Sequence, residues 1–192
     1  MNICVYGAAS KSIDAKFTDA GYDLGLKLAK RGHGLVFGGG NGGMMGAVAR
    51  GAHDGGAHII GIAPSFFNID GVLYPLSDEV IYTETMRQRK QKMEDMSGAF
   101  IVTPGGIGTF EEFFEILTLK QLARTDKPLV ILNTAGYYDS MLMMMRHSIE
   151  NNFLTASTMG LIFVADTPDE ALDYITDYRS QEVDIKKLRN VE

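Results

Sequence analysis

The sequence predicts an α/β protein: a single doubly wound, Rossmann-like domain built on a mostly parallel sheet. Short apolar runs without strict alternation, typical of strands that are buried on both faces, recur along the chain. Amphipathic segments of helical period separate these runs, and such an order places helices on both faces of a parallel sheet. At 192 residues the chain is long enough for one well-buried core and short for two.

Each apolar run is expected to form a strand, and most of the segments between them a helix. The expected strands are residues 3–6, 34–37, 58–62, 80–82, 99–102, 128–132 and 161–164. The expected helices are residues 14–31, a segment from the loop at 38–43 to about 55, residues 86–96, a segment from 113 onward, and residues 138–151 and 167–178. The domain therefore spans 1–178, and a polar C-terminal tail, 179–192, follows it.

The composition argues against several classes of protein. The chain has 18 basic and 24 acidic residues, and a net charge of -6 argues against nucleic-acid binding. The single cysteine, Cys4, excludes an internal disulfide and a cysteine zinc cluster, and the four histidines show no metal-ligand spacing. No apolar run reaches membrane-spanning length, and the chain begins without a signal-peptide pattern. We expect a cytoplasmic protein that binds neither membranes nor metals.

A glycine-rich loop at residues 103–109 carries the strongest functional signal. It joins a predicted buried strand to a predicted helix, and its glycines leave backbone N–H groups uncovered. The free amides and the dipole of the helix that follows favour an anion at this place. We therefore expect a phosphate to be held by backbone amides and a hydroxyl in this loop, which supplies Gly105, Gly106, Ile107, Gly108 and Thr109.

Glu112 follows this loop directly, where its carboxylate would repel the phosphate. The position makes sense if the acid acts on the sugar that carries the phosphate. Thr109-x-x-Glu112 also has the spacing of a capping box, in which the acid bonds the amide of the N-cap residue. Thr167-x-x-Glu170 has the same spacing without a glycine loop before it. The pattern alone leaves a capping role and a catalytic role for Glu112 equally open.

Arg89 is the second candidate for a reactive site. Thr85-x-x-Gln88 predicts a helix start, which places Arg89 in the first full turn, on the same stripe as Met93 and Met96. A guanidinium on a buried face requires an anion, which a ligand or an internal salt bridge can supply; the alternative is that its end reaches the surface. Lys90, at the margin of the same face, is expected to supplement it.

A second glycine-rich loop, residues 38–43, contains a G-x-G-x-x-G spacing made by Gly38, Gly40 and Gly43. Dinucleotide-binding domains carry this motif after the first strand and an acid about 20 residues later. Here the motif follows the second predicted strand and lacks that acid, so NAD binding is not expected. Two roles remain open, a wall of the ligand site and close packing of helix against strand.

These motifs resemble the LONELY GUY (LOG) family, phosphoribohydrolases that activate cytokinins and were formerly labelled lysine decarboxylases. The resemblance runs from about residue 3 to residue 175. The pattern P-G-G-x-G-T-x-x-E is met by Pro104, Gly105, Gly106, Gly108, Thr109 and Glu112. The pattern Met-x-x-Arg-Lys is met by Met86, Arg89 and Lys90, and G-G-G-x-x-G-x-M-G by Gly38, Gly39, Gly40, Gly43, Met45 and Gly46.

The resemblance implies that Arg89 and Glu112 are the catalytic pair and that the chain assembles as a homodimer or a larger homo-oligomer. The family's first strand often ends in Cys-Gly-Ser-Ser, and of residues 7–10 in this chain only Ser10 keeps a hydroxyl. A lysine decarboxylase would need pyridoxal phosphate on a lysine, and the sequence shows no recognisable site for it.

The resulting hypothesis is hydrolysis of the N-glycosidic bond of a purine nucleoside 5′-monophosphate, AMP or a cytokinin-type nucleotide, to free base and ribose 5-phosphate. The expected substrate-binding residues are Ser10, Gly40, Gly43, Met86, Lys90, Gly105, Gly106, Ile107, Gly108 and Thr109. No cofactor is expected. The alternative is a nucleotide-binding or carrier protein that uses the same pocket without turnover.

Overall fold

Seven short strands pair in one parallel sheet within residues 1–180, the part of the chain that the computed structural model describes. They are β1 (Asn2–Tyr6), β2 (Gly34–Phe37), β3 (Ile59–Pro64), β4 (Glu79–Thr83), β5 (Ala99–Val102), β6 (Leu129–Leu132) and β7 (Phe163–Ala165). Val5 of the central strand lies opposite Phe37 on one side and Ile101 on the other. Strands β3, β5 and β6 are buried along their whole length, whereas the edge strand β4 is exposed or half-buried.

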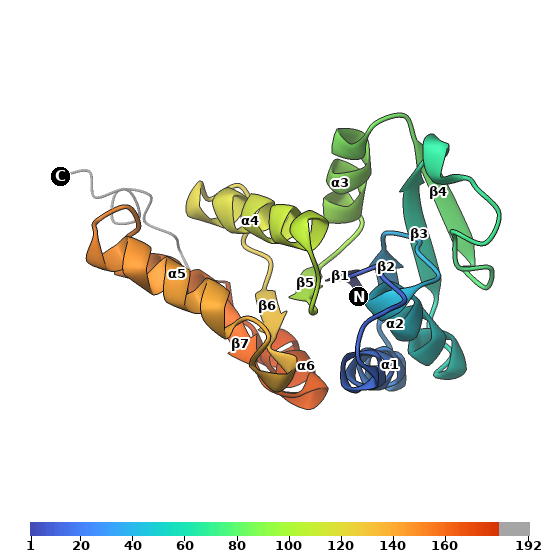
Figure 1. The fold of residues 1–192 in the computed structure, drawn as a ribbon, viewed down its shortest axis with the longest axis horizontal. Helices are drawn as coiled ribbons and strands as arrows, with labels where there is room; N and C mark the ends of the chain where they lie inside the picture. Colours follow the sequence, from blue (N-terminus) through green and yellow to red (C-terminus); the bar gives the residue numbers. More distant parts are fainter. Residues whose placement is uncertain (181–192) are drawn as a thin grey trace.

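Helices cover both faces of this sheet (Figure 1). They are α1 (Ala15–Lys30), α2 (Gly43–Asp54), α3 (Met86–Asp95), α4 (Ile107–Gln121), α5 (Asp139–Glu150) and α6 (Pro168–Asp177). On one face, α1, α2 and α6 enclose a core that includes Leu24, Val48 and Leu172. On the other face, α3, α4 and α5 contribute residues such as Met93, Phe113 and Leu142. The predicted doubly wound, Rossmann-like α/β fold is confirmed.

The order of the strands determines where a ligand can bind. The order is β4-β3-β2-β1-β5-β6-β7, so the chain runs outward from β1 in one direction and from β5 in the other. Loops that follow β1 and β5 therefore separate at the carboxyl edge of the sheet and leave a crevice between them.

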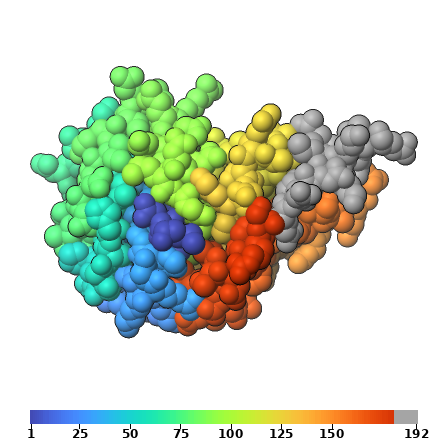
Figure 2. All heavy atoms as spheres, turned by 180° about the vertical axis from the view of Figure 1, so that it is seen from behind, coloured from blue at the N-terminus to red at the C-terminus, as the bar shows by residue number. Residues whose placement is uncertain are grey.

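The first residues of the chain (dark blue in Figure 2) lie at the surface, and the carbonyl of Met1 accepts a hydrogen bond from the amide of Gly34.

Two predicted boundaries were wrong. The strand expected at 161–164 begins at Phe163, because residues Ala156–Leu161 form a 3-10 helix, η3, and pairing with β6 starts where Val130 faces Phe163. Helix α4 begins at Ile107 rather than near 113, because its N-cap is Gly106 within the glycine loop.

The predicted polar tail, 179–192, lies outside the described residues from 181 onward. Among the helices of residues 1–180, none is both long and apolar enough to cross a membrane.

Lys120, near the C-terminal end of α4, is buried with only 2% of its surface exposed. Its ammonium group donates to the backbone carbonyl of Lys127 at 2.6 Å and to the hydroxyl of Tyr178 at 3.3 Å. It also lies 5.4 Å from the centre of the Tyr178 ring, within the range of a cation–π contact. Burial lowers the pKa of Lys120 from 10.5 to about 8, against a smaller opposing effect of Asp126.

Replacing Lys120 by methionine should alter how stability depends on pH. Between pH 8 and 10.5 the unfolded state holds the Lys120 proton that the folded state has lost, so the free energy of unfolding gains a contribution that rises with pH. Lys120→Met lacks this contribution. Urea unfolding at pH 7.5 and pH 10 should therefore show the wild type gaining stability relative to the variant.

Lys127→Met is the matched control, because the Lys127 ammonium group also donates to a backbone carbonyl, that of Glu94. This control should keep the Lys120 contribution. If wild type and Lys120→Met change in parallel with pH, Lys120 does not titrate in this window.

Candidate active site

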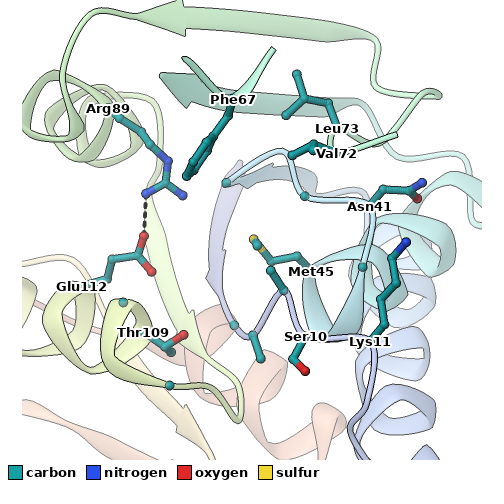
Figure 3. A pocket seen from close by; sticks show the side chains of 18 of the residues that line it. Ser10, Lys11, Asn41, Met45, Phe67, Val72, Leu73, Arg89, Thr109 and Glu112 are labelled. Carbon is teal, nitrogen blue, oxygen red and sulfur yellow. Dashed lines mark hydrogen bonds and ion pairs between the residues drawn. The ribbon is translucent and has the colours of Figure 1, made fainter. Parts of the chain in front are cut away.

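A pocket of about 630 Å³ opens at the carboxyl edge of the sheet, where the loops after β1 and β5 separate. Residues 7–11 form one side, and the start of α4 and Arg89 of α3 form another. The glycine loop after β2 and part of the segment between β3 and β4 close it (Figure 3). The pocket thus occupies the place where open α/β sheets bind their ligands.

Arg89 and Glu112 meet on one wall of this pocket (Figure 3). Nη1 of Arg89 donates to Oε1 of Glu112 at 2.7 Å, and Nε donates to the carbonyl of Ile62 at 3.0 Å. Both side chains are largely buried, at 7% and 10% exposure. The prediction that Arg89 lies on a buried face is confirmed. The anion that pairs with Arg89 is the carboxylate of Glu112, an internal salt bridge, and this ion pair faces the pocket.

The start of α3 fixes the position of Arg89. The hydroxyl of Thr85 accepts from the amide of Gln88, and the side chain of Gln88 accepts from the amide of Thr85. This is the capping box that the sequence predicts, and it holds the first turn in a defined orientation. Arg89 follows Gln88 directly and points back toward the sheet. There its Nε donates a hydrogen bond to the carbonyl of Ile62, near the C-terminal end of β3.

Glu112 combines one fixed oxygen with one open oxygen. Oε1 is held by Arg89, while within residues 1–180 Oε2 makes no hydrogen bond and points toward the pocket (Figure 3). Burial raises the pKa of the Glu112 carboxyl, and the charge and hydrogen bond of Arg89 oppose that rise. A carboxylate in this state is held in place and is a better proton acceptor than an ordinary glutamate.

The capping interpretation of Glu112 was wrong. The N-cap of α4 is Gly106, so Thr109 is the third helical residue and Glu112 lies a further turn along. Because no side chain caps this end, the first amides of α4 stay available to a ligand. Three residues of this helix end line the pocket: Gly106, Gly108 and Thr109. The side chain of Thr109 is buried and fills the space that a Cβ at Gly105 would need, so this position requires glycine.

Two tyrosines that the sequence analysis did not single out hold this loop in place. The hydroxyl of Tyr137 donates to the carbonyl of Gly105 at 2.7 Å, and that of Tyr138 donates to the carbonyl of Thr103 at 2.7 Å. Both precede α5, which packs beside α4 on the same face of the sheet. Both tyrosines hold the backbone of the glycine loop in place through its carbonyls. They are 32 and 35 positions away in the chain from the residues that they contact, so only the tertiary structure shows this contact.

The glycine loop after β2 serves both roles that the sequence left open. A Cβ at Gly38 would overlap Nη2 of Arg89, so this glycine makes room for the guanidinium. Gly40 lines the pocket. Gly43, by contrast, has a φ of +56° and packs against the carbonyls of Ala8 and Ser10, which is a packing role.

The structure brings together eight of the predicted site residues around the pocket: Ser10, Gly40, Met86, Arg89, Gly106, Gly108, Thr109 and Glu112. Four others lie outside its lining: Gly43, Lys90, Gly105 and Ile107. Lys90 points to the outer side of α4, where it pairs with Glu111 and with Glu115 at 2.7 Å. The side chain of Ile107 is 81% exposed, so only its backbone can serve the pocket.

Asn41 lines the pocket within the glycine loop that the sequence offers as a wall of the site. Other lining residues were not predicted from the sequence: Lys11, Met45, Phe67, Val72 and Leu73. Met45 belongs to the second glycine motif, and the position of that motif after a strand could have pointed to it. Phe67, Val72 and Leu73 lie in the connection between β3 and β4, whose sequence has no helical or strand period. The structure shows that this connection crosses the pocket, and this places the three residues in its lining.

The fold and the pocket define a Rossmann-like protein whose ligand site lies at the switch point of the sheet. Over residues 45–175 the chain matches the family described as "Possible lysine decarboxylase". It is 38% identical over 175 residues to a protein of Oryza sativa subsp. japonica named probable cytokinin riboside 5′-monophosphate phosphoribohydrolase, covering 91% of this chain and 83% of that one. It is 39% identical over 176 residues to an Arabidopsis thaliana cytokinin riboside 5′-monophosphate phosphoribohydrolase, covering 92% and 82%. The chain belongs to this family, the LOG family.

A solved structure supports the fold. The molybdenum cofactor binding protein from Rippkaea orientalis superposes with a TM-score of 0.70 at 24% identity, over 91% of this chain and 94% of that one. At this identity the likeness concerns the architecture alone.

Breaking the ion pair should destabilise the protein in a pH-dependent way. Arg89→Met leaves the Glu112 carboxylate buried without its partner, which should cost about 3–5 kcal/mol near neutral pH. Without Arg89, burial raises the pKa of Glu112 in the folded variant above its value in the unfolded chain. Between these two pKa values the folded state holds one proton more than the unfolded state, so the free energy of unfolding falls as pH rises. Chemical unfolding should show a greater loss at pH 8 than at pH 5.

Arg87→Met is the control, because Arg87 lies on the exposed side of the same turn. Adding Glu112→Gln to Arg89→Met should recover part of the stability, since no buried charge remains. A loss that is equal at both pH values would contradict this account of the pair.

Proposed function

We propose that this protein hydrolyses the N-glycosidic bond of a purine nucleoside 5′-monophosphate, releasing the base and ribose 5-phosphate. One observation carries the proposal: Glu112 presents an open carboxylate oxygen to a pocket whose adjacent wall is an uncapped helix N-terminus. An acid beside an anion site suits a substrate in which a sugar separates the phosphate from the bond that breaks. The names of the relatives, which are phosphoribohydrolases, support the same reaction.

In this proposal the phosphate of the substrate binds at the start of α4. The free amides there, the helix dipole and the Thr109 hydroxyl are suited to a dianion. Ser10, on the facing loop after β1, also lines the pocket and carries a second hydroxyl, which accepts a hydrogen bond from the amide of Ser12. Binding energy from the phosphate then positions the sugar against Glu112, which lies about one turn further along the helix.

The chemical step needs water as its co-reactant. The bond between C1′ and the base nitrogen breaks, and its electron pair leaves with the base, so positive charge develops on the ribose. The ionised Glu112 carboxylate stabilises this charge. The water oxygen bonds to C1′ and Glu112 accepts a proton from that water. Solvent supplies the proton that the departing base takes up, and Glu112 returns its own proton to solvent.

Arg89 supports this step through Glu112. Its hydrogen bond fixes the orientation of the carboxylate, and its charge limits the rise in the Glu112 pKa that burial causes. Arg89 therefore favours the ionised form of Glu112, while burial makes its carboxylate more basic than that of an ordinary glutamate. The guanidinium also lines the pocket, where it can contact the nucleotide.

We also propose that the chain forms a homodimer or larger homo-oligomer in the cytoplasm. Met143 and Met144 on α5 and Phe153 just after it are more than half exposed, and such apolar surface is typical of a contact between subunits. Cys4 is a buried free thiol, which fits a reducing compartment.

Glu112→Gln should reduce turnover of AMP by about 10²- to 10⁴-fold, because the amide neither stabilises the cationic sugar nor accepts a proton. Glutamine keeps the size of the side chain and an oxygen for Arg89. Release of adenine from AMP, followed by chromatography, measures the effect. Turnover by the variant at the wild-type rate would remove Glu112 from catalysis, and AMP binding by the wild type without adenine release would support the carrier alternative.

Gly38→Ala should lower kcat by about 10- to 100-fold while the fold is kept. The added methyl overlaps the Arg89 guanidinium, and a displacement of about 1 Å in a catalytic group has effects of this size. Gly38 does not have a positive φ, so alanine causes no backbone strain. Gly160→Ala, where a Cβ meets open space, is the control that should retain full activity. Equal kcat in Gly38→Ala and wild type would mean that the position of Arg89 is not critical.

A further inference from the structure

The segment between β3 and β4 forms one wall of the pocket and is fixed at both ends. It starts as a short 3-10 helix, η1 (Ser65–Phe67), directly after β3. It returns across the glycine loop through an antiparallel bridge between Gly40 and Leu73. The amide of Asn41 donates to the carbonyl of Val72 at 2.9 Å, and the amide of Tyr74 donates to the carbonyl of Gly39 at 2.8 Å. The wall is therefore tied to the same loop that makes room for Arg89.

Phe67 projects from this wall into the pocket (Figure 3). Its side chain is 41% exposed although it is large and apolar. Among the described residues, its one aromatic neighbour is Phe66, in an edge-to-face arrangement with ring centres 4.9 Å apart. Phe66 itself is not part of the pocket lining. An aromatic face is thus left open inside a pocket, where a flat ligand can cover it.

The order of groups along this side of the pocket matches the order of parts in a nucleotide. Thr109 lies beside the helix N-terminus, Glu112 follows it one turn further along α4, and Arg89 bonds to Glu112. Phe67 and Arg89 both line this pocket, and in Figure 3 the Phe67 ring is drawn on the same side of it as the Arg89 guanidinium. A phosphate at Thr109 and a ribose at Glu112 leave the base in the region of Phe67.

The surroundings of Phe67 favour contact with a ring face over recognition of polar edges. Four further apolar side chains line the same pocket: Met45, Val72, Leu73 and Met86. The Arg89 guanidinium is already engaged with Glu112 and with the carbonyl of Ile62. Apolar walls with an open aromatic face suit a planar heterocycle, because every nucleobase has a π face.

We propose that Phe67 is the stacking platform for the base of the substrate and a determinant of nucleotide affinity. The inference rests on the proposed function, since the phosphate and the ribose set the position of the base. Phe67 takes no part in the bond-breaking step. It holds the base while the bond to C1′ is lined up with Glu112.

Phe67→Ala tests this role in steady-state kinetics with AMP. Stacking of one base on an aromatic ring supports a rise in KM of about 5- to 100-fold on removal of the ring. The effect on kcat should be smaller. Phe67→Trp should retain a KM close to that of wild type, and Phe67→Leu should fall between, because leucine keeps apolar area without a flat face.

Inhibition by ribose 5-phosphate provides the decisive second readout. This molecule has the phosphate and the sugar but no base, so its inhibition constant should be the same for wild type and Phe67→Ala. A loss of ribose 5-phosphate affinity equal to the loss for AMP would mean that the substitution collapses the wall, and the stacking assignment would be overturned. Ile69→Ala, in the same segment, 61% exposed and outside the lining, is the control that should change neither constant.

The outcomes separate this inference from the proposed function. If wild type hydrolyses AMP and the KM of Phe67→Ala equals that of wild type, Phe67 does not stack on the base while the hydrolase stands. If wild type binds AMP without turnover, and binding weakens in Phe67→Ala, the platform stands and the hydrolase falls. If wild type neither binds nor hydrolyses AMP, both fall. Melting temperatures of all variants, expected to be close to wild type because Phe67 is half-exposed, confirm that they fold.

Discussion

The buried ion pair between Arg89 and Glu112 is the interaction on which the rest of the pocket depends. Either charge alone would destabilise the fold at this depth, because an unpaired charge with so little exposure is costly. The pair also links α3 to α4, and the Arg89 bond to Ile62 links both to the end of β3. The side chain of Arg89 therefore aligns three elements around the crevice through two contacts, and one oxygen of the Glu112 carboxylate still faces the crevice.

Close approach of backbone to side chain makes this contact possible. Gly38 leaves space for the guanidinium, and Gly105 leaves space for the side chain of Thr109. Tyr137 and Tyr138 then hold the second loop through its carbonyls. The glycines thus serve two separate needs: they open volume for polar groups and they leave the helix N-terminus uncovered. These internal contacts hold the polar groups of the pocket in defined positions, which favours catalysis through positioning.

The wall between β3 and β4 differs from the other connections. It joins two parallel strands without a long helix, so it can lie across the carboxyl edge of the sheet rather than cover a face. Its bridge to the glycine loop ties pocket-lining residues such as Leu73 to the loop that makes room for Arg89. The proposed site for the base is therefore linked to the position of Arg89 through a few backbone hydrogen bonds.

The sequence by itself determined the layered α/β fold, the anion-favouring loop and the burial of Arg89, because these follow from local period, glycine content and helix capping at Thr85. It misplaced the start of α4 and could not choose between a cap and a catalyst for Glu112, since Thr109-x-x-Glu112 is compatible with both. Tertiary structure excluded the cap, because the N-cap of α4 is Gly106, and it brought Glu112 to Arg89: the two are 23 positions apart and meet only when α3 and α4 pack on one face. Tertiary structure also directs Lys90 outward to Glu111 and Glu115, and it brings Phe67 into the pocket. The direction of a side chain and the path of a loop both depend on neighbours that are distant in the chain, so the local sequence does not show them.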